Sequence, residues 1–440
     1  MKNIPMSQNQ KNGSVIAIVT MFFLYAMIAF VTNLGAPIGV IWKNQPGIDG
    51  NNMLGMMGNF MNFFAYLFMG IPAGKMLTKV GYKKTALIGI AVGFFGVLIQ
   101  YLSSFPEGIP GFCVYLLGAF ISGFSVCILN TVVNPMLNLL GGGGNRGNQL
   151  NLIGGSLNSL TGTLTPLVVG ALIGEVTKST AMADVNLVLY IAMAVFAVAF
   201  CILFFIPIED PEMGRVTSET KFEHSPWSFR HCTLGVIAIF VYVGVEVGIP
   251  GALNFYLSDG TEKGAGLIEN AAKIGGAVAA MYWLLMLIGR LLSGFIAGKV
   301  SSRQLMLVTT SVAMVLILAA MFIPKTNTVS MPLFDIMNFN FWSATVPLSA
   351  LLLVLCGLCT SIMWASIFNL ATEGLGKYTA QASGIFMMMV VGGGVLPLIQ
   401  GWFSNFMGYM PSYFVYLLAV AYMFYYALVG CKNVNKDIPV

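Results

Sequence analysis

Charge is what this sequence has least of. Only 8% of its 440 residues are Asp, Glu, Lys or Arg, whereas a soluble domain carries about 25%. Hydrophobic residues make up 57% of the chain, and the mean hydropathy is +0.84. So few charges cannot cover a surface that faces water, so the composition excludes a soluble globular domain and indicates an integral membrane protein.

Groups for catalysis are scarce as well. The sequence has only two histidines, His224 and His231, and no GxxxxGK[ST] loop for ATP. An enzyme in the membrane needs a metal cluster, an activated nucleophile or paired carboxylates, and an ATP-driven pump needs a nucleotide loop. We therefore expect no enzyme activity, no metal site, no cofactor and no nucleic-acid partner.

The seven cysteines are too dispersed to form a disulfide framework. Cys356 and Cys359 form a CxxC, but they lie within an apolar run. We expect them to be small packing residues rather than a redox or metal pair.

Long apolar runs occupy most of the chain. Each spans about 20 residues or more, the length that crosses the hydrocarbon core of a bilayer. The first run continues to Ile41, beyond the roughly 7–15 residues of a signal-peptide core, so we expect it to remain as a span. The twelve predicted spans are 15–42, 52–74, 84–104, 111–140, 148–174, 186–208, 232–257, 271–298, 304–324, 341–371, 379–403 and 410–430.

The chain repeats itself about half-way along. GKMLTKVGYKK (74–84) has an echo in GKVSSRQ (298–304), and PLVVG (166–170) matches PLIQG (397–401). We predict an all-α membrane fold of twelve helices in two parallel six-helix halves, residues 1–208 and 231–440, joined by a polar linker at 209–230. Such repeats create a central cavity that opens alternately to each side of the membrane.

Lysines and arginines lie mostly on the side of the two termini. By the positive-inside rule, this bias predicts that both termini are cytoplasmic in a cell inner (plasma) membrane. We expect a multi-pass monomer surrounded by lipid.

The loop after the second predicted span resembles the G-x-x-x-D-R-x-G-R-R signature of the major facilitator superfamily. The matching positions are Gly74, Lys79 and Gly81, with Thr78 in place of the usual acid. The resemblance implies that Gly74, Lys79 and Gly81 belong to a cytoplasmic gate, although plain positive-inside topology explains the lysine equally well.

A more specific resemblance begins at LNTVVNPMLNLLG (129–141) and QLNLIGGSLNS (149–159). These segments are similar to the fucose permease family of sugar–cation symporters, and the likeness extends over most of the chain. It implies a sugar site in which Asn158 falls on an asparagine that contacts sugar and Asn33 falls near another.

Two departures from that family concern its acids. Asn130 stands where the family has a carboxylate, and Ala36 stands where it has an aspartate. The resemblance assigns those acids to proton coupling and sugar binding, so the proton mechanism is not simply inherited. We keep Asn130 as a candidate sugar-binding amide, because it lies near mid-membrane, about 15 Å deep, as does Asn158. A buried amide that holds helices together is the alternative.

Glu246 is the one acid placed deep inside a predicted span. Since a charge at mid-bilayer costs about 2.5–3.5 kcal/mol, we take Glu246 as a candidate for ion coupling and substrate binding. The alternative is an ion pair with Arg290, which the predicted spans place nearer the cytoplasmic edge, roughly 12 Å deep against roughly 21 Å for Glu246. We assign Arg290 to gating or structure.

Trp364 is a candidate for stacking on a sugar ring, and Asn369 follows it in the same span. The alternative is that these residues face lipid or an interface, as most aromatic side chains in such a chain do.

Together these patterns predict a sugar–cation symporter, with a proton or sodium as the co-transported ion. An ion-independent uniporter or exchanger and a sugar-sensing transceptor remain as alternatives.

Overall fold

The computed structural model describes residues 8–140, 144–173, 180–206, 223–267, 269–296, 300–375, 378–435 and 438. In the first half of the chain, the helices are α1 (Gln8–Lys43), α2 (Asn52–Gly55), α3 (Met57–Val80), α4 (Tyr82–Leu102), α5 (Gly108–Leu140), α6 (Gly144–Ile173), the short η1 (Met182–Val185) and α7 (Asn186–Phe205).

The second half adds a β-hairpin to its helices. Its elements are η2 (Pro226–Ser228), α8 (Arg230–Ser258), α9 (Ala271–Ile296), α10 (Ser302–Phe322), β1 (Thr328–Asp335), β2 (Asn340–Pro347), α11 (Leu348–Thr360), α12 (Met363–Thr372), α13 (Thr379–Met389), α14 (Gly392–Met407), α15 (Tyr409–Ser412), α16 (Phe414–Tyr425) and the π-helical η4 (Tyr426–Gly430).

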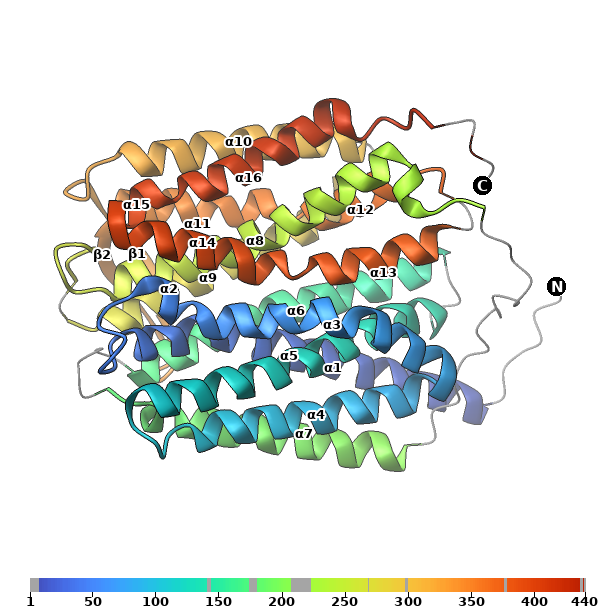
Figure 1. Cartoon of the computed structure of the whole chain (residues 1–440), viewed down its shortest axis with the longest axis horizontal. Helices are drawn as coiled ribbons and strands as arrows, with labels where there is room; N and C mark the ends of the chain where they lie inside the picture. The colour runs from blue at the N-terminus through green and yellow to red at the C-terminus, as the bar shows by residue number, and fades with distance from the viewer. Residues whose placement is uncertain are drawn as a thin grey trace.

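The helices run roughly parallel to one axis, with α1–α7 on one side of the molecule and α8–α16 on the other (Figure 1). The two groups meet mainly where α6 packs along α9 and where α3 packs against α13 and α14. We call the end of the bundle where α1 begins and η4 ends the terminal face. The distal face is the other end, where α1 ends at Lys43 and α8 ends at Ser258.

Eleven helical segments of the described chain are long and apolar enough to cross a membrane. The helix α3 packs with them in the bundle but is not one of the eleven, and it carries two asparagines, Asn59 and Asn62, near its start. Both amides are buried against other helices rather than exposed. The twelve-helix fold in two six-helix halves is therefore confirmed.

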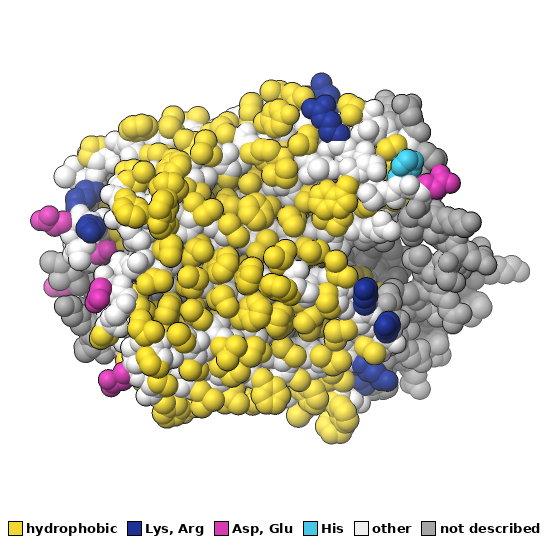
Figure 2. Space-filling model, in the orientation of Figure 1, with side chains coloured by type: hydrophobic (Ala, Val, Ile, Leu, Met, Phe, Trp, Pro, Cys, Tyr) yellow, Lys and Arg dark blue, Asp and Glu magenta, His cyan; other side chains and the backbone are white. Residues whose placement is uncertain are grey.

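The side surface of the bundle suits lipid. Figure 2 shows a band of hydrophobic side chains across the face in view, with the charged side chains at its two ends. Phe205 at the end of α7, Val315 within α10 and Phe322 at the end of α10 are all exposed. Because water would make this much exposed apolar area unfavourable, the surface is one that a bilayer covers.

The predicted tenth span was wrong at its start. Residues 341–347 form β2, which pairs antiparallel with β1, and the helix begins only at Leu348 after Pro347. Side chains of β1 alternate between exposed and buried, with Met331 and Leu333 inside. Alternation with period two favours a strand packed on one face. The hairpin packs on α9 and α11 at the distal face.

The predicted linker at 209–230 lies largely outside the described residues, which resume at Glu223.

Glycines let α6 and α9 approach closely near the distal face. A Cβ on Gly276 would overlap the carbonyl oxygen of Pro166, and one on Gly170 would lie 2.7 Å from that of Ala272. Small residues at such contacts are the usual means by which membrane helices pack.

We predict that Gly276→Ala lowers the free energy of unfolding by about 1–3 kcal/mol, because the added methyl group overlaps backbone atoms. Thermal unfolding of the purified protein in detergent measures the effect. Gly384→Ala is the matched control, since a Cβ there meets nothing within 4 Å. Equal unfolding temperatures for the two variants would show that the α6–α9 contact is not tight.

Candidate functional site

A small cavity lies between the two halves, in the part of the bundle nearer the distal face. It has about 20 Å³ of free volume, enough for a single water molecule. Its lining comes from α1, α3, α6, α8 and α9, and consists of Thr32, Asn33, Ala36, Pro37, Asn59, Pro166, Val247, Pro250, Gly251, Asn254, Ala279 and Trp283. In this state the halves therefore enclose a central space that is too small for a sugar.

Asn33, one of the predicted site residues, lines this cavity. Its side-chain nitrogen donates to the carbonyl oxygen of Ala29 at 2.8 Å, which leaves its side-chain oxygen as an acceptor. A Cβ built on Gly162 of α6 would lie 3.3 Å from the Asn33 nitrogen and 3.2 Å from the Trp283 ring. Asn33 of α1, Gly162 of α6 and Trp283 of α9 therefore lie next to one another.

Asn59 connects the halves at the same level. Its side-chain nitrogen donates to the carbonyl oxygen of Gly393 on α14 at 2.9 Å. Pro397 lies four residues after Gly393 and has no N–H, so that carbonyl has lost its partner in the helix. Asn59 satisfies it, and this explains a buried amide in α3 that would otherwise be costly in lipid.

Glu246 and Arg290 form an ion pair on the terminal side of the cavity. A nitrogen of Arg290 lies 3.0 Å from the carboxylate of Glu246. The other terminal nitrogen donates to the carbonyl oxygen of Gly155 and the hydroxyl of Ser159 on α6, each at 2.9 Å. The pair that the sequence left as an alternative is therefore present, because the long arginine side chain spans the expected difference in depth.

Arg290 also links the two halves. Glu246 and Arg290 belong to α8 and α9, whereas Gly155 and Ser159 belong to α6 in the first half. A change in the charge of Glu246 would alter the balance of attractions on Arg290 and, through it, the contact with α6.

Asn130 lies within the first half and not at the cavity wall. Its side-chain nitrogen donates to the hydroxyl of Tyr66 on α3 at 2.7 Å. One helical turn later, Asn134 accepts a hydrogen bond from Tyr25 of α1. These two amides join α1, α3 and α5.

The remaining predicted site residues are less central. Asn158 is half-buried on α6, one helical turn before Gly162, and is not among the residues that line the cavity. Trp364 contacts the ring of Tyr242, with centroids 6.1 Å apart, and does not line the cavity. Asn369 is exposed on α12.

The predicted gate loop is shorter than expected, because Gly74 and Lys79 belong to α3, which continues to Val80, and only Gly81 separates α3 from α4. Gly81 has φ +86°, a conformation that favours glycine, so its place in the loop has a structural reason. Lys79 is exposed, and Gly74 has nothing within 4 Å of a built Cβ. Lys83 donates to the carbonyl oxygens of Phe204 and Ile206, at 3.1 and 2.6 Å, which caps α7 within the same half.

Two helical halves that enclose a cavity with three asparagines in its wall, inside a membrane-spanning bundle, are the arrangement of a solute carrier. The model of the Major Facilitator Superfamily matches residues 13–397. The chain belongs to this superfamily and is a membrane transporter rather than an enzyme.

Its curated relatives match it along most of its length. The "Glucose/galactose transporter" of Brucella abortus biovar 1 (strain 9-941) is 29% identical over 434 residues, 97% of each chain. The "Putative glucose/galactose transporter" of Helicobacter pylori (strain J99) is 27% identical, covering 96% of this chain and 99% of the relative. The "L-fucose-proton symporter" of Escherichia coli (strain K12) is 23% identical, covering 80% and 78%.

Solved structures share the fold. The transporter FucP in its outward conformation aligns with a TM-score of 0.65 at 19% identity, covering 94% of this chain and 99% of that one. A point mutant of the nucleoside transporter NupG aligns with a TM-score of 0.62 at 16% identity, covering 94% and 98%.

Sequence reasoning missed Asn59 and Asn254 as cavity residues. Asn59 is a polar residue in an otherwise apolar helix, and this signal was available. Nothing in the sequence shows that Asn254, near the end of α8, turns inward toward α1.

We predict that Glu246→Gln and Arg290→Met each destabilise the protein, because each leaves a partly buried charge without its partner. The double variant should lose less than the sum of the two, with an interaction energy of about 0.5–3 kcal/mol. Thermal unfolding of the wild type, the two single variants and the double variant gives the free energies of this double-mutant cycle. Additive effects would mean that the ion pair contributes nothing to the folded state.

Proposed function

We propose that this chain is a sugar–cation symporter that carries a monosaccharide or small saccharide across the inner (plasma) membrane by alternating access. The observation that carries the proposal is the central cavity, where amides and an indole face one another from both halves. Amides offer both donors and acceptors to hydroxyl groups, and an indole face stacks on the apolar face of a sugar ring. The names of the curated relatives support the same substrate class.

The sugar site consists of Asn33 and Asn158, with Trp283 as the stacking surface, and it extends toward Asn130 and Glu246 when the halves part. Trp364 and Asn369 contribute only if α12 moves inward in another state of the cycle. Because the cavity in the present state has room for about one water, sugar enters only after the halves separate on one side.

The coupling ion, a proton or sodium, acts at Glu246. This carboxylate touches Arg290, whose other contacts are to α6 in the opposite half. Binding of a cation to Glu246 weakens its attraction for Arg290, so ion binding and the contact between the halves are linked. Arg290 is then a gating residue, and the terminal end of α3, with Gly74, Lys79 and the capping Gly81, moves at the terminal face.

The protein lies in the membrane as a monomer with both termini in the cytoplasm. The lysines at the end of α3 and the start of α4 support this orientation by the positive-inside rule. The terminal face is then cytoplasmic and the distal face is external.

Counterflow in proteoliposomes tests the proposal. Vesicles loaded with unlabelled sugar are diluted into labelled hexoses, deoxyhexoses or N-acetyl sugars, with and without sodium and a pH gradient. A symporter gives counterflow and concentrative uptake on an ion gradient. Counterflow without concentrative uptake indicates the ion-independent exchanger, and binding without any flux indicates the transceptor.

We predict that Asn33→Ala and Asn158→Ala each weaken binding of the transported sugar about tenfold, which corresponds to about 1.4 kcal/mol. The reason is that a hydrogen-bonding group matched to a hydroxyl is lost. Isothermal titration calorimetry on purified protein measures the affinity. Asn340→Ala is the control, because Asn340 is exposed on the β-hairpin and lies outside the cavity. Unchanged affinity in both test variants would remove α1 and α6 from the sugar site.

A further prediction concerns coupling. Glu246→Gln should abolish accumulation of sugar against a gradient while preserving counterflow, because the amide cannot take up a proton and holds a cation poorly. Uptake by wild type and variant is compared across pH and sodium concentration. Full concentrative uptake by the variant under every condition would place the coupling ion elsewhere.

A further inference from the structure

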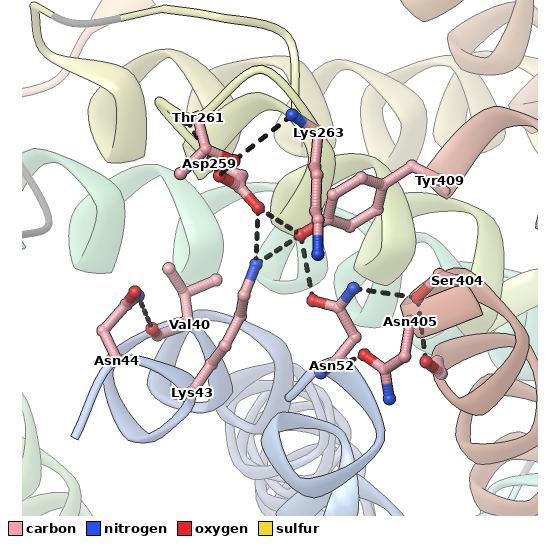
Figure 3. Close-up of polar contacts among 11 residues, drawn as sticks. Val40, Lys43, Asn44, Asn52, Asp259, Thr261, Lys263, Ser404, Asn405 and Tyr409 are labelled. Carbon is pink, nitrogen blue, oxygen red and sulfur yellow. Dashed lines mark hydrogen bonds and ion pairs between the residues drawn. The ribbon is translucent and has the colours of Figure 1, made fainter. Parts of the chain in front are cut away.

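A network of polar side chains joins the two halves at the distal face. The amino group of Lys43, at the end of α1, lies 2.8 Å from the carboxylate of Asp259, just beyond the end of α8. The hydroxyl of Tyr409 on α15 contacts both, accepting from Lys43 and lying 2.8 Å from Asp259. Figure 3 shows the three side chains converging from α1, α8 and α15.

A line of amide contacts extends the network along α2 and α14. The Tyr409 hydroxyl lies 2.9 Å from the side-chain oxygen of Asn52. The side-chain nitrogen of Asn52 donates to Ser404 at 2.9 Å, and its backbone N–H donates to Asn405 at 2.9 Å. Asn405 in turn donates to Asn51 at 2.9 Å. Each of these contacts connects the first half to the second, and Figure 3 shows Asn52 between Tyr409 and Ser404.

The ion pair in this network is almost completely removed from solvent. The side chain of Lys43 is 6% exposed and that of Asp259 is 11% exposed. The ammonium also lies 5.8 Å from the Phe255 ring centroid. Asp259 is further held by the N–H and hydroxyl of Thr261, at 3.0 and 2.6 Å. Parting the halves here leaves two desolvated charges that must regain water.

Lys43 and Asp259 occupy corresponding places in the two halves. Each lies at the end of the first long helix of its half, α1 and α8. The cavity-lining residues Asn33 and Asn254 precede them on the same helices. The network therefore lies across the path from the distal face to the cavity.

We propose that the Lys43–Asp259 pair, bridged by Tyr409 and Asn52, is a latch that closes the distal route to the cavity and sets the ratio of the two carrier states. This inference rests on the alternating-access cycle of the proposed function, but not on which sugar or ion is carried. The latch opens each time the sugar site becomes accessible from the distal face.

The latch is not operated by ordinary changes of pH through its carboxylate. Burial raises the pKa of Asp259, but the charge of Lys43 and the hydrogen bonds from Lys43 and Thr261 outweigh it, so the pKa is lowered to about 2. Asp259 therefore stays ionised between pH 5 and 8, and a pH dependence of transport in that range arises at another group.

Spin-label distances test the latch in the purified, sugar-free protein. Labels are placed on cysteines at Glu107 and Thr326, exposed positions in distal loops of the two halves, after Cys113 and Cys201 are replaced by serine. Lys43→Met should raise the population with the longer distance at least tenfold relative to the short one. Tyr409→Phe, which keeps the ring and removes the bridging hydroxyl, should shift the ratio in the same direction by a smaller factor.

Lys273→Met is the matched control. Lys273 and Asp335 form an ion pair at 2.6 Å near the same face, but α9 and β1 both belong to the second half. Losing that pair should leave the distance distribution unchanged. The exchanged pair Lys43→Asp with Asp259→Lys should recover part of the short-distance population.

Unchanged distances in both Lys43→Met and Tyr409→Phe, in protein that elutes as a single species, would overturn the latch. An equal shift in Lys273→Met would overturn it as well, because a general loosening of the distal face would then explain the change. If Lys43→Met does not fold, Tyr409→Phe and Lys273→Met alone decide. Because no sugar is present, these outcomes are independent of the counterflow result.

Discussion

The structure depends on one constraint: inside a bilayer a backbone polar group without a partner in the protein is costly, and so is an unpaired buried charge. The partners found here come repeatedly from the opposite half. Asn59 satisfies the carbonyl oxygen of Gly393, Arg290 reaches Gly155 and Ser159, and Lys43 pairs with Asp259. A carrier that must separate its halves therefore breaks polar contacts, not only apolar ones, in each cycle.

These contacts are arranged in levels along the transport path. The Lys43–Asp259 pair lies at the distal face, the cavity with Asn33 lies below it, and Glu246 with Arg290 lies on the terminal side of the cavity. Helix α8 carries Glu246, cavity residues and the end next to Asp259 in order. A shift of α8 therefore changes contacts at all three levels, so a small movement at one face can be coupled to a movement at the other.

Much of this was predictable from sequence. Runs of about 20 apolar residues identify spans, and the paired motifs identify two halves. Asn33 was predicted and lines the cavity, whereas Asn59 and Asn254 were not. The difference is physical: helical periodicity says which residues share a face, but not which neighbouring helix that face meets. The β-hairpin was missed because its apolar strand residues continue directly into α11.

The two buried amides of α3 also bear on how the protein is made. Asn59 and Asn62 are buried polar residues of α3, and Asn59 finds its partner, the Gly393 carbonyl, on α14. The two partners lie 334 residues apart in the chain. Until α14 has been synthesised, the Asn59 amide lacks this partner, and α3 has only the helices of its own half, mainly α5, to pack on. Assembly of the halves therefore gives a polar group of α3 a partner that is translated much later.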